Sequence, residues 1–475
     1  MNYYIFIQVT LSAIFAFVAV SWIYFKILKI AFNKNLVDNP DTRKLQKMPI
    51  PVMGGIAVYF GVLVGVMAGT VLHALICAPS ATSLLPVICS MSVMLYVGAM
   101  DDIQGLSPKS RLIIEILAML ALIYSSGACL DSFGGMWGVS GFSWWAAVPL
   151  TVFAGVGIIN AVNMIDGVNG LSSGLCITCC LFFGAAFINI GDISNAVLAS
   201  TTFGALMPFF IHNVFGMKSR MFIGDAGTMA MGVLLTWFTI CLVGTDRSVL
   251  CCSQDINTIA LSLAVLSVPV FDTLRVMGLR IIHKKSPFHP DKTHLHHIFI
   301  NVGVSHFITS MSIILIDIVV VGILTVSVAA GAGCEWQLYI VMLSSIILVW
   351  GTYFILKYHA RHHTRFLHRL TRLSVKTHLG RKEWWKKLSD YLDAPGEYED
   401  TKSQMMVAGL DNDRNLIVNY MKGRAEVMVQ DIIDNSGADK HHVYNILSEE
   451  VKAGRIIVTK EGYWGGPEIV SLTEK

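Results

Sequence analysis

Two polar clusters that contain aspartate lie at the ends of apolar runs of the sequence, and their residue types suit the binding of a divalent cation and a phosphate. Asp101 and Asp102 are adjacent and follow directly on an apolar run. Adjacent carboxylates repel each other, and a hard divalent cation relieves the repulsion by taking oxygen ligands. Asp225 lies between Gly224 and Gly227, just before a second apolar run. Glycines let the backbone approach a ligand closely and a helix N-terminus favours a phosphate, although this segment alone would also fit an ordinary turn with a helix cap.

A third cluster, in the segment NAVNMIDGVNGLSSG, combines amides with a carboxylate. Its members recur at intervals of three residues: Asn160, Asn163, Asp166 and Asn169. At the end of a helix this spacing aligns the side-chain oxygens and amides along one side. Such a row suits a sugar, the edge of a uracil ring or a metal-bound water.

The fourth cluster, in the segment SPFHPDKTHLHHIF, is rich in histidine. Its basic members are His289, Lys292, His294, His296 and His297. Histidines so close together can bind zinc, with Asp291 as a conceivable further ligand. Lys292 in their midst disfavours a bound cation and favours a phosphate. We therefore expect anion binding here, with a zinc site as the alternative.

Transmembrane helices must position these four clusters. Of the 475 residues, 54% are apolar and 14% are charged, which excludes an ordinary soluble chain. A spanning helix needs about 20 apolar residues. We predict an all-α polytopic membrane protein with about eleven such helices, and a first span that is retained rather than cleaved as a signal peptide. The predicted spans are residues 3–30, 52–77, 84–100, 112–126, 144–159, 171–190, 196–211, 229–243, 259–276, 308–330 and 338–356.

The basic residues of the connecting loops are distributed unequally. Among the loops after spans two, four, six, eight and ten, the only basic residue is Arg247, whereas the other loops hold nearly all the rest. The positive-inside rule then places those other loops and the C-terminus in the cytosol, and the N-terminus outside. All four polar clusters fall in the basic set of loops, so we expect them to meet on the cytosolic face. Solvated loop charges would explain one such cluster easily and four poorly.

The sequence changes character after the last predicted span, which closes a transmembrane domain at 1–356. Residues 357–400 form a basic segment and linker, with ten Lys or Arg between 357 and 390. This segment favours an amphipathic juxtamembrane helix on anionic lipid, with RNA contact as the alternative. Residues 401–475 show helical patterns at 415–421, 427–435 and 440–451 and strand-like segments RIIVTK and EIVSLT, an order similar to a winged-helix α+β domain. With nine Lys or Arg against eleven Asp or Glu, this domain is not expected to bind nucleic acid.

The four clusters, in this order, resemble the polyprenyl-phosphate N-acetylhexosamine-1-phosphate transferase family over residues 1–305. Two further segments match: DNPDTRKLQKMPIPVMGG, which contains Arg43 and Lys44, and PVFDTLRV, which contains Asp272 and Arg275. The histidine segment is most similar to the undecaprenyl-phosphate N-acetylglucosaminyl 1-phosphate transferase branch. The chain departs from the family pattern at Asn169, where many members have aspartate, at Glu115, where glutamine is common, and at Lys292, where arginine is frequent.

The resemblance implies that the chain transfers an N-acetylhexosamine 1-phosphate, N-acetylglucosamine 1-phosphate in particular, from a UDP-sugar to undecaprenyl phosphate. UMP would leave, and the product would start a lipid-linked cell-surface glycan such as O-antigen. Implied catalytic residues are Asp101, Asp102, Asp166, His294, His296 and His297. Implied substrate-binding residues are Lys109, Asn160, Asn163, Asn169, Lys292, Arg43 and Lys44. Magnesium, or manganese in its place, would bind Asp225 with Asp102.

The resemblance also implies an inner (plasma) membrane enzyme whose active face is cytosolic. Its partners would be the two substrates, membrane lipids and a second copy of the chain in a homodimer. The alternative is a transporter or flippase for a lipid or polyol phosphate, whose charged residues would line a path across the bilayer. Only Asp317 lies near the centre of a predicted span, and the sequence gives no function for it.

Overall fold

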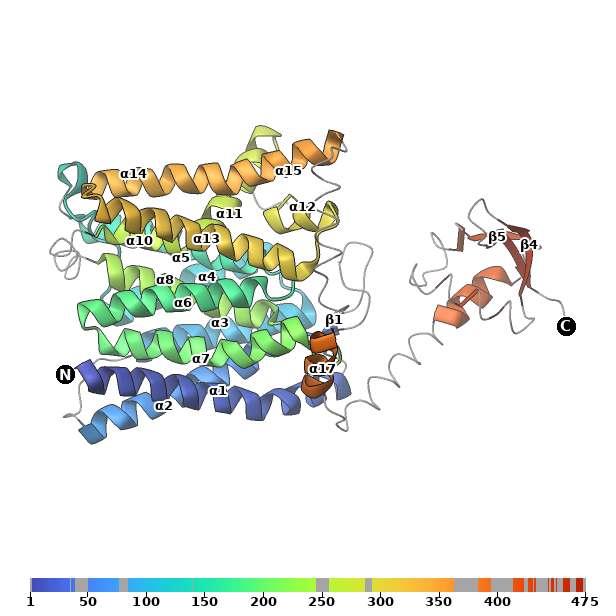
Figure 1. Ribbon diagram of the computed structural model, residues 1–475, viewed down its shortest axis with the longest axis horizontal. Coiled ribbons are helices and arrows are strands. Elements are labelled where there is room, and N and C mark those ends of the chain that lie inside the picture. Colours follow the sequence, from blue (N-terminus) through green and yellow to red (C-terminus); the bar gives the residue numbers. More distant parts are fainter. Residues whose placement is uncertain are drawn as a thin grey trace. The chain divides into compact units, whose positions relative to one another are not determined.

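The computed structural model contains two compact units, of which the larger is a bundle of long helices (Figure 1). The larger unit comprises Met1–Leu28 and Val52–Asp393, and the smaller comprises Lys29–Pro51 and Ala394–Lys475. The structure describes residues 2–34, 36–38, 50–76, 84–139, 141–244, 256–286, 293–362 and 383–393, with parts of 413–472. Arg43, Lys44 and Lys292 lie outside these ranges, as do His289 and Asp291.

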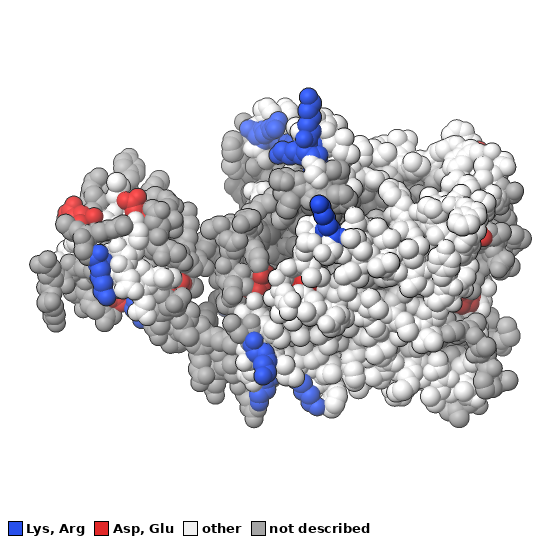
Figure 2. All heavy atoms as spheres, turned by 180° about the vertical axis from the view of Figure 1, so that it is seen from behind, with Lys and Arg blue, Asp and Glu red and all other residues white. Residues whose placement is uncertain are grey.

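In the described part of the chain, nine helices are long and apolar enough to cross a membrane. They are α1 (Asn2–Asn33), α2 (Gly54–Ile76), α3 (Leu85–Gln104), α5 (Trp144–Met164), α6 (Leu171–Ile190), α7 (Ile193–Phe215), α8 (Gly224–Val243), α13 (His306–Ala329) and a continuous helix made of α14 (Cys334–Ser345), η2 (Ile346–Trp350) and α15 (Gly351–His362). The face of the bundle seen in Figure 2 has a wide surface that is almost without charged side chains among the described residues, and Lys and Arg gather toward one end. An uncharged surface suits contact with hydrocarbon.

The two remaining predicted spans are helical but differ from simple crossings. Helix α4 (Pro108–Ser126) carries Lys109, Arg111 and Glu115 in its first half and does not meet the criterion of length and composition that the nine helices meet. Helices α10 (Thr258–Val265) and α11 (Ser267–Ile282) meet at a bend of 75° and together count as a tenth candidate. Each predicted span therefore coincides with a helix in the described region, while a total of eleven crossings is not confirmed and stays a prediction.

The break between α10 and α11 explains the acid in the middle of a predicted span. A helix interrupted inside a membrane leaves backbone groups unpaired unless neighbouring side chains bind them. Asp317 of α13 accepts hydrogen bonds from the Ser267 hydroxyl (2.7 Å) and the Val268 amide (3.3 Å) at the start of α11. Cys179 of α6 donates to the Val265 carbonyl at the end of α10 (3.3 Å). Asp317 thus has a structural role in stabilising the bend.

Helix α8 lies at the centre of the bundle, enclosed by α3, α5 and α2. Glycines allow its start to approach its neighbours closely. A Cβ at Gly98 of α3 would come within 2.5 Å of the Cα of Ala226, and Gly227 packs against the backbone of Gly55 in α2. This packing brings the end of α3 to the beginning of α8, where Asp102 and Asp225 lie.

Two short helices lie at the end of the bundle opposite the N-terminus (Figure 1). They are α12 (Leu295–Asn301) and α17 (Glu383–Leu392). Helix α11 is fixed against the last long helix there, because Trp350 donates to the Phe271 carbonyl (2.9 Å) and the Arg275 guanidinium stacks 3.6 Å from the Tyr353 ring centre. Of the predicted juxtamembrane segment 357–390, the structure describes only residues 357–362, the end of α15, and residues from 383 on, in α17.

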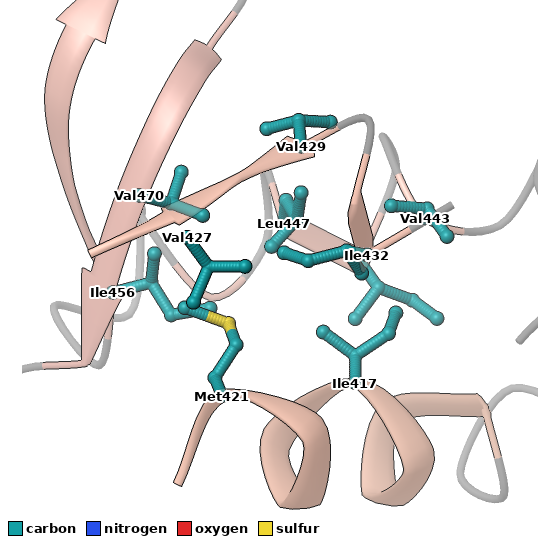
Figure 3. Close-up of a cluster of buried hydrophobic side chains, with 10 residues drawn as sticks. Ile417, Met421, Val427, Val429, Ile432, Val443, Leu447, Ile456 and Val470 are labelled. Atoms are coloured by element: carbon teal, nitrogen blue, oxygen red, sulfur yellow. The ribbon is translucent and has the colours of Figure 1, made fainter. Parts of the chain in front are cut away.

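The smaller unit contains two small sheets. Strand β1 (Val37–Asp38) pairs with β2 (Ile50–Pro51), and β3 (Val427–Met428), β5 (Pro467–Leu472) and β4 (Ile456–Glu461) form an antiparallel sheet in the order β3-β5-β4. The two predicted strands are confirmed. The helix predicted from residue 427 is wrong at its start, because Val427 and Met428 pair with Val470 and Ile469. A winged-helix fold stays a prediction. The core of this region consists of Ile417, Met421, Val427, Val429, Ile432, Val443, Ile446, Leu447, Ile456 and Val470 (Figure 3).

Candidate active site

Asp102 caps the N-terminus of the central helix α8. Its Oδ1 accepts a hydrogen bond from the Asp225 amide (3.0 Å) and its Oδ2 accepts one from the Ala226 amide (3.2 Å). A carboxylate there stabilises the helix end, since the first amides of a helix have no partner within it. Gly224 precedes them with a φ of 71°, and a Cβ at this position would lie 2.6 Å from Oδ2 of Asp102. The glycine therefore serves the approach of two protein segments to each other.

Of the three acids that pair with Arg111, namely Asp101, Glu115 and Asp225, Asp225 has the most exposed side chain. Its side chain is 37% exposed, against 12% for Asp101. Oδ1 accepts a hydrogen bond from Asn163 (2.9 Å), and the same amide group lies 2.8 Å from the Thr228 hydroxyl. Asn163 thus fixes Oδ1 of Asp225 from the neighbouring helix α5, while Oδ2 lies 3.5 Å from Arg111, so a ligand at Oδ2 would compete with a weak ion pair.

Arg111 at the start of α4 joins three acids from α3, α4 and α8. It lies 3.3 Å from Asp101, 3.1 Å from Glu115 and 3.5 Å from Asp225. Glu115 is fully buried and also accepts a short hydrogen bond from Asn160. The guanidinium offsets a local excess of negative charge, which would otherwise be costly at the edge of a membrane.

The amide cluster and the histidine cluster touch at Gly167. A Cβ on Gly167 would collide with the His296 ring, so only glycine fits between the two segments. The neighbouring Asp166 accepts a hydrogen bond from the Ser172 hydroxyl (2.6 Å). Burial raises the pKa of Asp166 to about 6; the Ser172 hydroxyl opposes this rise and the charge of Asp225 adds to it. Asp166 can therefore take up or release a proton near neutral pH.

His294 is oriented by a buried network on α11. Its Nδ1 lies 2.9 Å from Oδ2 of Asp272, whose Oδ1 binds Arg275 (2.7 Å), and Arg275 also donates to the Thr293 carbonyl (2.6 Å). In the described part of the chain, Nε2 of His294 is buried without a hydrogen-bond partner. A carboxylate on one ring nitrogen fixes the orientation of the ring and leaves the other nitrogen free for a further hydrogen bond. Asp272 and Arg275 of the matched segment PVFDTLRV therefore hold His294 and the backbone before it in place.

The rings of the three described histidines of the fourth cluster lie next to one another, and those of His294 and His296 are nearly parallel. The His296 ring lies 5.9 Å from that of His294 and 4.2 Å from that of His297. Burial, together with the neighbouring His297 and His294, lowers the pKa of His296 well below its usual range. His296 is accordingly neutral at pH 7, and its Nδ1 is buried without a hydrogen-bond partner among the described residues.

Two further predicted site residues are described, Lys109 and Asn169. Lys109 is exposed on the first turn of α4, two residues before Arg111. Asn169 is bonded through its backbone to α13, where its amide lies 3.5 Å from His306 and its carbonyl accepts from Ser310 (2.7 Å). Roles in substrate binding for Lys109 and Asn169 stay predictions.

Arg111 and Glu115 are site residues that the sequence did not single out. In the sequence, Arg111 counts only as one of the basic residues of the loops, and Glu115 only as a departure from the family pattern. Their spacing of four residues, directly after the paired aspartates, puts both on one face of α4. That spacing is the signal that could have identified them.

A magnesium ion fits this cluster only with help from a substrate. Within the described ranges, no three His, Cys, Asp or Glu side chains converge closely enough to hold a metal by themselves. Mg²⁺ in phosphate-transferring proteins is commonly bound by one or two carboxylates together with substrate phosphates and waters. The accessible Asp225, with Asp102 beside it, provides such a partial set of ligands.

Comparison with known proteins gives consistent matches. Residues 84–243 match the model of glycosyl transferase family 4. The chain is 30% identical over 292 residues, 61% of its length, to the probable undecaprenyl-phosphate N-acetylglucosaminyl 1-phosphate transferase of Bacillus subtilis (strain 168), of which 77% is covered. It is 30% identical over 286 residues to the undecaprenyl-phosphate alpha-N-acetylglucosaminyl 1-phosphate transferase of Yersinia pestis, with 58% of this chain and 72% of the relative covered. Identity to the enzyme of the same description from Escherichia coli (strain K12) is 28% over 338 residues, with 67% and 84% covered.

These matches agree with the architecture and with the convergence of the motif residues. With nine described helices that can cross a membrane, the chain is a multi-pass membrane protein. The family match spans α3 to α8, the helices that carry Asp101, Asp102, Asn163 and Asp225. The chain therefore belongs to glycosyl transferase family 4, the polyprenyl-phosphate N-acetylhexosamine-1-phosphate transferases.

Proposed function

We propose that the chain transfers N-acetylglucosamine 1-phosphate from a UDP-linked donor to undecaprenyl phosphate and releases UMP. The observation that carries this proposal is the convergence of Asp102, Asn163, Asp225 and His296 from separate segments at one end of the bundle. The names of the relatives in Bacillus subtilis and Yersinia pestis support both the acceptor and the transferred group.

The reaction needs alignment and charge neutralisation more than covalent help from the protein. An oxygen of the lipid phosphate bonds to the sugar-bearing phosphorus of the donor, and the bond from this phosphorus to the oxygen of UMP breaks. A phosphomonoester has a second pKa of about 6, so much of the acceptor is ionised without a dedicated base. Asp101 or Asp166 would take the remaining proton, and the pKa of about 6 at Asp166 suits that task.

Buried imidazoles would hold phosphate oxygens during the transfer. His294 and His296 each have a ring nitrogen that lacks a partner in the described region, although both rings are buried. A buried donor or acceptor without a partner is costly, so a ligand that binds there recovers free energy. Lys292 and Arg111 would add positive charge, and Asn160 and Asn163 would face the sugar or the uracil ring.

Asp225 and Asp102 would hold Mg²⁺, for which Mn²⁺ could substitute. When bound, the ion would neutralise charge on the donor diphosphate. The protein's own contribution is to hold the Asp225 side chain in one rotamer through Asn163 and to fix its backbone through Asp102.

We further propose that the site faces the cytosol at the inner (plasma) membrane and that the product starts a lipid-linked cell-surface glycan. Basic side chains gather at one end of the bundle in Figure 2, and the positive-inside rule favours a cytosolic position for that end. A homodimer, expected from the family, belongs to the same proposal.

The test is release of labelled UMP by the purified full-length protein in lipid nanodiscs. UDP-N-acetylglucosamine, UDP-N-acetylgalactosamine and a deoxy derivative are supplied in turn, each with and without undecaprenyl phosphate and Mg²⁺. We expect release with the first donor that depends on both additions. Absence of release with every donor, from protein that is folded and inserted, would refute the proposal.

A further inference from the structure

The loop 216–223 between α7 and α8 leads directly into Gly224 and Asp225, and most of its backbone is held by other segments. At its end, the Phe222 carbonyl accepts from the Gly54 amide (2.9 Å) and the Ile223 carbonyl accepts from the Gly55 amide (2.8 Å). The Met221 carbonyl accepts from Asn213 (2.8 Å). The second half of the loop is thus fixed by α2 and α7, both of which belong to the bundle.

The first half of the loop is held by a residue of the C-terminal segment. The carboxylate of Asp393 accepts hydrogen bonds from three consecutive amides, those of Met217 (2.9 Å), Lys218 (2.9 Å) and Ser219 (2.8 Å). Successive amides that point at one anion form a strong binding concavity. Burial alone would raise the pKa of Asp393, but the Ser219 hydroxyl and the three amides outweigh it and lower the pKa. The carboxylate is therefore ionised at neutral pH.

Helix α17 is docked through a stripe of buried side chains, which places Asp393 against the loop. Trp385, Ser389 and Leu392 are buried, at spacings of four and three residues along one face. The Trp385 ring lies 5.0 Å from Phe215, the last residue of α7. The docking therefore involves both the apolar packing of Trp385 on Phe215 and the hydrogen bonds of Asp393 to the loop that follows Phe215.

We propose that Asp393 is a positioning residue for the transferase reaction, and that the docked α17 holds the loop 216–223 so that Asp225 keeps its place. The inference rests on the proposed function, because Asp225 is the residue proposed to bind the donor's metal. It assigns a task to a segment beyond the last long helix, where none of the four motif clusters lies. Without Asp393, the amides of residues 217–219 would bind water instead and the loop would open more often.

The test compares Asp393→Ala and Asp393→Asn with Asp390→Asn in the full-length protein. Asp390 lies three residues earlier on the exposed side of α17, so its substitution removes the same charge without touching the loop. Amide hydrogen exchange is measured on the peptide that covers residues 216–223, in the absence of substrate. The kcat, the KM for the UDP-sugar and the Mg²⁺ concentration for half-maximal rate are measured separately.

We expect faster exchange at residues 217–219 in Asp393→Ala, an intermediate effect in Asp393→Asn and none in Asp390→Asn. The rate at subsaturating donor should fall on the order of tenfold or more in Asp393→Ala, with a higher Mg²⁺ requirement, because small displacements of a binding group are costly. If the alanine variant does not accumulate, the asparagine variant decides. Unchanged exchange, or faster exchange with unchanged kinetics, would overturn the inference. Failure of wild-type UMP release would refute the proposed function instead, while the exchange comparison would still test the docking.

Discussion

Replacing Asp102 with asparagine should loosen the start of α8. Asp102 accepts one backbone hydrogen bond on each oxygen, at 3.0 and 3.2 Å, and asparagine can keep only one of them because its amide nitrogen is a donor. A hydrogen bond to a charged acceptor contributes about 1.5–3 kcal/mol, and an anion at a helix N-terminus adds about 0.3–1 kcal/mol. Since Asp102 is partly exposed, we take the low end, about 2 kcal/mol, which corresponds to about a 30-fold change in the opening equilibrium.

Amide hydrogen exchange measures this change directly. In Asp102→Asn, the amides of Asp225 and Ala226 should exchange about 30-fold faster than in the wild type, in the presence of EDTA and without substrate. Asp101→Asn is the matched control, because Asp101 accepts from the Leu106 amide and pairs with Arg111, whereas Asp102 is the acceptor for the first amides of α8. Equal exchange in the two variants would show that Asp102 does not cap α8 and would refute the reasoning.

Three further predictions concern other members of the site. Asp225→Asn keeps a side-chain oxygen that can accept the hydrogen bond from Asn163 but loses the negative charge, so metal-dependent turnover should fall on the order of a hundredfold or more while the protein stays folded; near-normal UMP release would contradict this. Because burial raises the pKa of Asp166 from its usual range to about 6, the ligand-free protein should lose stability as pH rises from about 4 to 6. Asp166→Asn should therefore raise the melting temperature more at pH 7.5 than at pH 5, and an equal change at both would count against the assignment. Gly167→Ala should displace the His296 ring and reduce turnover, with a cost of about 1–3 kcal/mol in stability; unchanged activity and melting temperature would mean that the two segments do not pack as described.

Much of the site follows from sequence because its residues lie at the ends of apolar runs. Asp102, Asn163 and Asp225 each end or begin a helix that the apolar pattern predicts, and the loop charges place these ends on one face. Glycine at 224 was predicted to allow a close approach, and its φ of 71° agrees, although the approaching group is Asp102 rather than a ligand. Local patterns thus indicate which ends meet.

Contacts between elements could not be read from local patterns. The pairing of Arg111 with Asp225 joins residues 114 positions apart, and its geometry depends on how α4 packs against α3 and α5, the helices that flank α8. No function for Asp317 follows from the sequence. Pro269, in the first turn of α11, is consistent with a helix that restarts after the break at Leu266, but a local pattern does not show which distant side chain binds the freed backbone. With Asp317 assigned to that break, the residue that best suited a transporter has a structural explanation.

The central claim is that segments around Asp102, Asn163 and Asp225 surround one divalent cation. Replacing Mg²⁺ with Fe²⁺ and adding ascorbate and peroxide cleaves or oxidises the chain only near the bound ion, and mass spectrometry maps the sites. We predict damage in residues 100–103, 162–167 and 224–227 together, dependent on the UDP-sugar, outcompeted by Mg²⁺ and absent in Asp225→Asn. Damage confined to one of these segments, or persisting in that variant, would contradict the claim.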